Sequence, residues 1–490
     1  MKNPLGITVT KENNFSEWYS QIVQKAELGD IRSGIQGFLV HRPWGFFIIK
    51  KIYEYLEEEI DKQGHQQFLF PISVKEKDLM REKEHAGFNP DVFWVTQGGS
   101  KKLEEKFALR PTGEAQIYPM YSLWFRSHRD LPFRGYQSRI SVFRNEMTTW
   151  PFMRGREFLF LETHNVYNEH KEALSQIKLD LGTCEKVIYD KIKIPFKYFK
   201  RPQWDRFKGA DNTFTPDTLM PDGKRNQLAS THDLGQNFSK AFNIKVKDKN
   251  EKEQNVWQTC FGPGIWRIMA ALIAIHGDDN GLIIPFDMSQ LQIVIIPITF
   301  SDKKIESKKV VDNCKKIESM ISKLGYRVKF DNDEEKPGFK YNKWELFGVP
   351  LRIEVGPKEV KSKSVSLALR TEKKKKQVKI SSLDKEIKKS SLKVDKDIKD
   401  NADKYFKNNT RSTNSFKELK EIIKKYKGFI KVPFCSVEMD GEKCADKLKA
   451  DTQGGNVCGT LYPKEEKLST KKCVICGKKA NHLVYIAKSY

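Results

Sequence analysis

Cysteine is scarce in this sequence: there are 8 among 490 residues, most of them from Cys435 onward. So few cysteines in so long a chain do not make a disulfide scaffold. Long apolar runs are missing too, and no stretch approaches the ~20 apolar residues that a bilayer span needs. A charged stretch followed by an apolar one is the usual leader of a secreted chain. No such leader precedes Phe15. We therefore expect a cytoplasmic protein with no membrane contact.

Acidic residues are too few to balance the basic ones. The chain has 64 Asp and Glu against 88 Lys and Arg, a formal charge of +24 at pH 7 and a pI near 9.4. This excess is larger than solubility requires and predicts a polyanionic partner. No internal repeat is visible, and the length leaves room for roughly two to four domains.

The chain has three regions that differ in residue composition and hydrophobic pattern. We predict domains at 1–288, 289–385 and 386–490. The first mixes amphipathic helical stretches with β-rich pieces. From Ser289, strand-like and helical runs alternate, which predicts a small α/β domain. Lysine is dense from Thr371 to Lys427. That stretch fits a solvated helical face or linker and an RNA-backbone contact about equally well.

Charged and aromatic residues flank a short polar break at Thr148 and Thr149, between two β-rich segments. Arg144 and Glu146 precede the break and, two apart on a strand, would point to the same side. After the break, residues of the same parity are Arg154, Arg156, Phe158, Phe160, Glu162 and His164. The pattern predicts one surface of cations, aromatics, an acid and an imidazole.

A glycine turn at 262–264 precedes Arg267 and a helical apolar run. Glycines let the backbone approach a ligand, and an arginine at a helix start can reach a phosphate. Together with Arg144, Arg267 would suit a nucleoside triphosphate whose pyrophosphate leaves. Catalysis would then depend on positioning and electrostatics.

The FRxE pattern at 143–146 and the later GxGxxR pattern at 262–267 resemble motifs 2 and 3 of the class II aminoacyl-tRNA synthetases. The best match within the class is the prolyl-tRNA synthetases of the archaeal and eukaryotic type. It is carried by LRPTGE (109–114), THDLGQNFSKAF (231–242), PGFKYNKWELFGVPLRIEVGP (337–357) and YIAKSY (485–490). The resemblance implies an α+β fold, with an antiparallel-sheet catalytic domain, an α/β anticodon-binding domain and a small C-terminal zinc-binding α/β domain.

The same resemblance implies a two-step reaction, in which L-proline is activated by ATP and then transferred to the 3′ end of tRNA(Pro). It implies that Arg144 holds the α-phosphate and the substrate carboxylate, and that Glu146 holds the adenine amino group. Arg154 and Arg267 would hold the outer phosphates. Gln227 and Thr259 would complete the nucleotide site, and Mg²⁺ would bridge the phosphates. Which carboxylate helps to hold Mg²⁺ stays open.

Resemblance also implies an amino-acid pocket formed with Arg144 by Thr112, Glu114, Phe160, Glu162, His164, Ser230, His232 and Cys260. We expect Glu114, on a strand with Thr112, to pair with the substrate's secondary ammonium, because an unpaired buried charge is costly. Gly113, Ser230 and Trp266 depart from the family pattern. They leave open a synthetase for another small amino acid or an analogue. A non-catalytic tRNA-binding paralogue is the other alternative, and the retained arginines argue against it.

The two-residue spacing of Cys473 and Cys476 is typical of a tetrahedral zinc site. Cys435 and Cys444 would supply the other two thiolates, with Cys458 a rival for Cys444. The resemblance to a C-terminal zinc-binding domain favours this assignment. Cys184 and Cys314 fall in helical patterns and are expected in the core.

Anticodon reading is implied for the α/β domain, at Glu345, Arg352 and Lys358, because carboxylates and arginine match the edges of guanine. The resemblance also implies a homodimer whose interface lies near Pro71. Between Glu146 and Arg267 the chain has no room for a large editing insertion.

Overall fold

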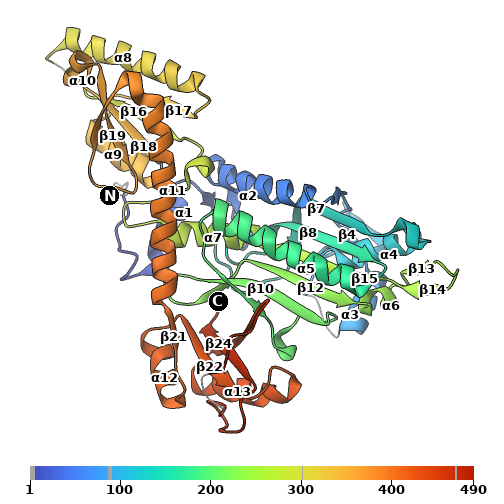
Figure 1. Ribbon diagram of the computed structural model, residues 1–490. Coiled ribbons are helices and arrows are strands. Elements are labelled where there is room, and N and C mark those ends of the chain that lie inside the picture. Colours follow the sequence, from blue (N-terminus) through green and yellow to red (C-terminus); the bar gives the residue numbers. More distant parts are fainter. Residues whose placement is uncertain (1–5, 87–90, 301, 469–471) are drawn as a thin grey trace.

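The computed structural model describes residues 6–86, 91–300, 302–468 and 472–490. Figure 1 shows a broad central region of sheet and helices, an α/β unit at one end and the last strands of the chain at the other. The long helix α11 (Leu383–Asn408) runs between the two outer regions. In the described ranges, no helix has both the length and the apolarity of a membrane span.

A mostly antiparallel sheet forms the centre, and its spatial order is β3, β7, β8, β15, β12, β10 and β9. These strands are β3 (Gln66–Gln67), β7 (Phe133–Phe143), β8 (Glu157–Tyr167), β15 (Trp257–Pro263), β12 (Ala229–Gly235), β10 (Asn212–Leu219) and β9 (Lys197–Lys200). The two β-rich segments predicted around Thr148 and Thr149 are β7 and β8, which pair antiparallel. That prediction is confirmed.

Helices cover the two faces of this sheet differently because strand residues alternate between faces. Leu161 and Phe261 pack into a core with α1 (Phe15–Lys25), α2 (Pro43–Asp61) and α7 (Ile265–His276). Helix α5 (His170–Cys184), which continues as a π-helical turn (Glu185–Lys191), also covers this face. On the other face, Val166 and Cys260 pack with α4 (Glu114–Trp124) and α6 (Asn237–Ala241). An open cavity lies by the end of β7, with residues of β8, β12 and the start of α7 in its lining.

Short elements surround the central sheet. They are β1 (Gly29–Asp30), β2 (Val40–His41), β4 (Ser73–Lys75), α3 (Glu76–Ala86), β5 (Trp94–Gly98), β6 (Lys101–Leu109), β11 (Arg225–Gln227), β13 (Lys245–Lys247) and β14 (Glu253–Asn255). Strand β11 pairs with β10, and β4, β6 and β5 form a separate small sheet.

The alternation predicted after Ser289 is confirmed as a five-stranded sheet with the order β17, β16, β18, β19 and β20. Its elements are β16 (Ile293–Pro297), α8 (Lys304–Lys323), β17 (Val328–Phe330), α9 (Pro337–Leu346), β18 (Leu351–Val355), α10 (Pro357–Ser362), β19 (Ser364–Leu369) and β20 (Lys376–Lys379). Cys314 is buried on α8, as expected.

Strands from the end of the chain extend the central sheet, so that it reaches twelve strands. Strand β23 pairs with β9 through Thr460 with Lys200 and Leu461 with Phe199. The added elements are β21 (Thr410–Ser412), α12 (Phe416–Lys425), β22 (Phe429–Phe434), α13 (Glu442–Asp451), β23 (Gly455–Leu461) and β24 (His482–Lys488). Backbone pairing therefore joins the C-terminal region directly to the central sheet.

The lysine-dense stretch contains α11, whose apolar side recurs at helical spacing. Its buried residues are Leu383, Ile387, Ser390, Val394, Ile398, Ala402 and Phe406. The first of these join the core of the α/β unit, whereas Phe406 joins the core beside β9 and β24. Several exposed lysines pair along the helix with acids four residues away, including Lys388 with Asp384 at 3.0 Å. The stretch is thus largely an amphipathic bridging helix.

Candidate active site

A cavity of about 210 Å³ opens on the helix-poor face of the central sheet. The predicted site residues that line it are Thr112, Arg144, Glu146, Arg154, Phe160, Gln227, Ser230 and Arg267. They come from the loop before α4, from the loop between β7 and β8, from β8, β11 and β12, and from the start of α7. One wall is aromatic, since the rings of Phe158 and Phe160 lie 6.2 Å apart.

Arg144 and Glu146 are not strand residues, contrary to the sequence prediction, because β7 ends at Phe143. The backbone N–H of Arg144 still donates to the carbonyl of Arg156 at 2.9 Å, which keeps the loop in register with the return strand. The guanidinium of Arg144 lies 5.9 Å from the centre of the Phe158 ring. Both side chains reach the cavity from this short loop.

Arg267 enters the cavity from the first turn of α7, which begins after Gly264. The Gly264 N–H donates to Leu228 at 2.8 Å. A Cβ at Gly262 would lie 3.0 Å from the Phe160 ring, so a side chain there would crowd the aromatic wall. The turn predicted at 262–264 is shorter than expected, because β15 runs to Pro263 and only Gly264 separates it from α7.

Cations face one another across the cavity. Burial lowers the pKa of Arg267, and the charges of Arg144 and Arg154 lower it further. Glu146 and Asp217 offset only part of this repulsion. A bound polyanion would relieve it, because it would place negative charge between the three guanidiniums.

Below the cavity lies a buried polar group that includes Glu114, Glu162 and His164. The Glu162 carboxylate lies 3.1 Å from Nε2 of His164, and Nδ1 of His164 lies 3.0 Å from the Tyr118 hydroxyl. Burial disfavours the Glu162 carboxylate, but His164, Gln137 and Arg110 together outweigh it, and the pKa of Glu162 falls below its usual value. For His164, burial is likewise outweighed by Glu162, which raises the histidine pKa.

Glu114 is the first residue of helix α4, not a strand residue as predicted. It is 2% exposed, and the Thr112 hydroxyl donates to its carboxylate. Burial, together with the charge of Glu162, raises the pKa of Glu114. Of the two pocket carboxyls, Glu162 is therefore the one favoured to carry the charge, and Glu114 holds a proton more tightly.

Cross-strand pairing places His164, Cys260 and His232 side by side on β8, β15 and β12. Nε2 of His232 lies 3.1 Å from the Ser230 hydroxyl, and Nδ1 lies 3.0 Å from Thr213. Burial lowers the pKa of His232 to about 3, so its imidazole is neutral. His232 therefore shapes the pocket through neutral hydrogen bonds.

Thr259 is not brought to the cavity, which corrects its predicted place in the nucleotide site. On β15 it is fully buried, and its hydroxyl accepts from Asn165 at 3.3 Å on the opposite face of the sheet. Residues one apart on a strand face opposite ways. Cys260 and Gly262 therefore face the pocket and Thr259 does not.

Other residues at the site were missed by sequence reasoning. Buried Arg201 donates to Gln227 at 3.1 Å and to Asp217 at 3.0 and 2.9 Å. Tyr490 lines a smaller cavity that shares Arg154 and Arg267 with this one, and its carbonyl accepts from Arg154 at 2.9 Å. These contacts join segments far apart in the chain. The family stretch YIAKSY, which ends at Tyr490, was the only available signal.

Trp266, one of the departures from the family pattern, packs beneath the motif 2 loop. A Cβ at Gly155 would lie 2.5 Å from its indole ring. Nε1 of Trp266 donates to His41 at 2.9 Å, and its ring lies 5.9 Å from that of Phe152. The tryptophan therefore supports the cavity wall and is fixed by its neighbours.

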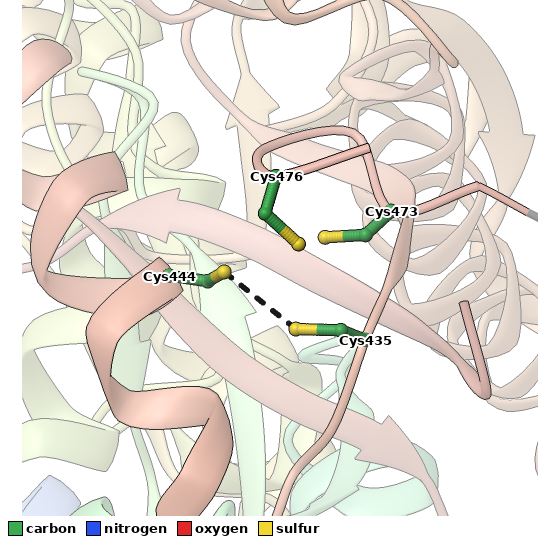
Figure 2. A group of neighbouring side chains, drawn as sticks. All are labelled: Cys435, Cys444, Cys473 and Cys476. Carbon is green, nitrogen blue, oxygen red and sulfur yellow. Dashed lines mark hydrogen bonds between the residues drawn. The ribbon is translucent and has the colours of Figure 1, made fainter. Parts of the chain in front are cut away.

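Four cysteines converge in the C-terminal region, at the positions predicted for zinc. In Figure 2 the side chains of Cys435, Cys444, Cys473 and Cys476 point toward a common centre. One ligand atom from each lies within 4.8 Å of the others, and the sulfurs of Cys435 and Cys444 are 3.6 Å apart. Cys458 stays outside this cluster, buried on β23. The chemistry of four thiols at this spacing fits Zn²⁺.

In the α/β unit, Glu345 and Arg352 form one group and Lys358 lies elsewhere. Arg352 donates to Glu345 at 2.8 Å and to Glu354 at 3.0 Å, and its guanidinium lies 4.1 Å from the Tyr341 ring centre. Glu345 and Arg352 line a cavity of about 320 Å³. Lys358 is exposed on α10 and does not line that cavity.

Family models match most of the chain. The family described as "tRNA synthetase class II core domain (G, H, P, S and T)" matches residues 93–276. "Anticodon binding domain" matches residues 292–390, and "Prolyl-tRNA synthetase, C-terminal" matches residues 416–490.

Individual proteins are similar over nearly the whole length. A proline--tRNA ligase of Thermofilum pendens is 48% identical over 487 residues, which cover 99% of each chain. A Giardia lamblia prolyl-tRNA synthetase solved with prolyl-adenylate has a TM-score of 0.94 and 34% identity, covering 99% of this chain and 100% of that one. A Cryptosporidium parvum prolyl-tRNA synthetase solved with L-proline and AMP has a TM-score of 0.92 and 31% identity, covering 100% and 98%.

Proposed function

Because the chain belongs to the prolyl-tRNA synthetase family of class II aminoacyl-tRNA synthetases, we propose that the cavity between Arg144 and Arg267 is where proline is activated. The chain is a proline–tRNA ligase. It joins L-proline to ATP as prolyl-adenylate, releases pyrophosphate and transfers the prolyl group to tRNA. The observation that carries the site assignment is the buried Glu114–Glu162–His164 group directly below three facing arginines.

In the first step, a carboxylate oxygen of proline attacks the α-phosphorus of ATP, and the bond to pyrophosphate breaks. Arg144 holds the α-phosphate and the proline carboxylate, while Arg154 and Arg267 hold the outer phosphates. The repulsion among these cations in the empty cavity is offset as charge moves onto the leaving pyrophosphate. Glu146 accepts from the adenine amino group, and Gln227, held by Arg201, completes the nucleotide site. Mg²⁺ would supply further charge neutralisation at the phosphates.

In the amino-acid pocket, Glu114 accepts from the secondary ammonium of proline and Phe160 packs against the ring. Glu162, His164, Ser230, His232 and Cys260 complete its floor. In the second step, the terminal ribose hydroxyl of tRNA attacks the carbonyl of prolyl-adenylate and AMP leaves. A pocket for a different small amino acid is the weaker alternative, since the changes at Gly113 and Ser230 alter volume by only a methyl or a hydroxymethyl group.

ATP–pyrophosphate exchange measured with each of the twenty amino acids tests this assignment. We expect proline to support the fastest exchange, with alanine and cysteine much weaker. Exchange supported best by a non-cyclic amino acid, with proline inert, would overturn the pocket assignment. A chain that binds tRNA but exchanges nothing would instead be a non-catalytic paralogue.

Further assignments extend the proposal to the rest of the chain. We assign residues 1–288 to catalysis, 289–385 to anticodon binding and 386–490 to a zinc-binding domain held by the four-cysteine cluster. Glu345, Arg352 and Lys358 are proposed to contact the anticodon of tRNA(Pro). A cytoplasmic location is proposed to follow from the protein-synthesis role.

A homodimer is proposed through the surface around Pro71. Its carbonyl accepts from Gln116 on α4, and nearby large apolar side chains are exposed. They are Leu69 at 78%, Ile72 at 43%, Leu123 at 59% and Trp124 at 45%. An exposed apolar surface of this kind marks a protein interface. Light scattering that gives a monomer mass at micromolar concentration would contradict it.

A further inference from the structure

Gln137 lies below the pocket, on β7, directly opposite Glu162 on β8. It is 0% exposed, and its Nε2 donates to Oε1 of Glu162 at 2.6 Å. The other oxygen of Glu162 faces His164 at 3.1 Å. The carboxylate is therefore held from two sides, by an amide and an imidazole.

The orientation of the Gln137 amide is fixed from behind. Its Oε1 accepts from Nη1 of Arg110 at 3.3 Å and from the Phe70 N–H at 3.4 Å. Arg110 is itself anchored, because it donates to the carbonyls of Ser141 at 2.9 Å and Phe70 at 3.2 Å. A flipped amide would put its NH₂ group against two donors, so only this orientation satisfies the site.

A β-bulge places Gln137 on the pocket face. The β7–β8 register shifts between Gln137 and Ile140, so these two residues oppose Glu162 and Phe160. Arg139, inside the bulge, has a φ of 57°. Without the extra residue, Gln137 and Ile140 would face opposite sides of the sheet, since they are three apart. Bulges commonly re-aim side chains next to active sites.

We propose that Gln137 is a positioning residue for amino-acid recognition. Its fixed N–H donor keeps Glu162 ionised and in place. Glu114 is then the carboxyl that pairs with the substrate ammonium. This inference rests on the proposed assignment of Glu114 and Glu162 to the amino-acid pocket. It adds a residue that touches neither substrate and acts only through Glu162.

The decisive variant is Gln137→Glu, which keeps the size of the side chain. When protonated, the new acid donates to Glu162 and still accepts from Arg110. When ionised, it repels Glu162 and has no donor to offer. The titratable and charged groups around this pair are Arg110, Glu114, Tyr118, Tyr121, Glu162, His164 and Cys260.

We expect Gln137→Glu to raise the KM for proline about tenfold or more near pH 8, with the KM for ATP changed less than about twofold. Lowering the pH should restore proline affinity in this variant. Lowering the pH should instead weaken proline binding by the unmodified protein, because Glu114 takes up a proton there. Opposite pH slopes of the two proteins would support the inference, and a purely structural defect predicts no reversal.

Two further variants keep the test decisive. Gln137→Met, similar in size but without a donor, should raise the KM for proline at every pH and show no acid recovery. Gln176→Glu, at another buried glutamine on α5, controls for a general cost of burying an acid and should leave the proline-to-ATP KM ratio unchanged.

The positioning role would be overturned if the KM for proline had the same value and the same pH dependence in Gln137→Glu, Gln137→Met and the unmodified protein. Glu162→Gln separates this failure from failure of the proposed function. If Glu162→Gln raises the KM for proline while the Gln137 variants do not, only the positioning role is wrong. If Glu162→Gln also leaves it unchanged, the pocket assignment is wrong.

Discussion

Replacing Glu114 by glutamine removes the carboxylate proposed to pair with the proline ammonium while it preserves size and the contact with Thr112. A charge-assisted hydrogen bond contributes about 1.5–3 kcal/mol, and each 1.4 kcal/mol is about tenfold in affinity. The KM for proline should therefore rise by about 10- to 150-fold. The KM for ATP should stay within about twofold, since the arginines of the nucleotide site are untouched.

Stability separates this loss from misfolding. The pKa of Glu114 is raised by burial and by Glu162, which favours the neutral acid when no ammonium is bound. Glutamine replaces one neutral group by another, and the thermal midpoint should not fall. Glu421→Gln, an exposed change on α12, is the matched control and should alter neither KM.

The pH dependence follows from the same pKa shift. Glu114 keeps its proton above its ordinary pKa, and a bound ammonium must displace it. Proline affinity in the unmodified protein should therefore weaken as pH falls through the raised pKa, with a proton released on binding. Glu114→Gln should lose this dependence. Exchange kinetics with varied proline at several pH values measure both effects, and an unchanged proline KM in Glu114→Gln would refute the reasoning.

Three other outcomes are expected. Metal analysis should find about one zinc per chain, and Cys473→Ser should lose it and unfold the C-terminal strands at lower temperature, because a structural metal contributes folding free energy; zinc-free protein of unchanged stability would contradict this. Arg144→Ala and Arg267→Ala should each slow ATP–pyrophosphate exchange about 100-fold or more with the fold intact, and near-normal exchange at saturating ATP would remove the residue from the phosphate site. Burial raises the pKa of Asp180 to about 7, so the folded state binds more protons than the unfolded one and stability should fall as pH rises from about 4 to 7. Asp180→Asn should flatten that decline, on the order of 4 kcal/mol, in urea titrations.

Local pattern predicted much of the site because its parts are short and contiguous. The strand pair around Thr148 depends on neighbours in sequence and was predicted correctly. The glycine turn before Arg267 was predicted too long, because β15 runs to Pro263 and only Gly264 lies between it and α7. The four zinc-site cysteines converge as predicted, and the fold decides between Cys444 and Cys458 by placing Cys458 on β23. Spacing alone left that choice open.

The errors arise where strand register, a helix boundary or a long-range contact decides the structure. Thr259 was assigned to the nucleotide site by family resemblance, but strand alternation turns it to the far face. Gln137 was missed because a bulge changes the face to which it points. Glu114 was expected on a strand because Thr112 lies two residues away, yet α4 begins there. Contacts such as Arg154 with Tyr490 depend on the closed tertiary fold, which no local pattern contains.

Pairing of β23 with β9 bears on how the chain withstands damage. If the sheet ended at β9, the N–H and C=O groups of Lys197–Lys200 on that edge would be unpaired. They could then pair with a strand of another chain. The final strands cover that side through Thr460 and Leu461. Proteolytic loss of 416–490 would therefore do more than remove the C-terminal domain. It would expose β9 as an edge strand of the catalytic sheet, and we expect the truncated enzyme to aggregate.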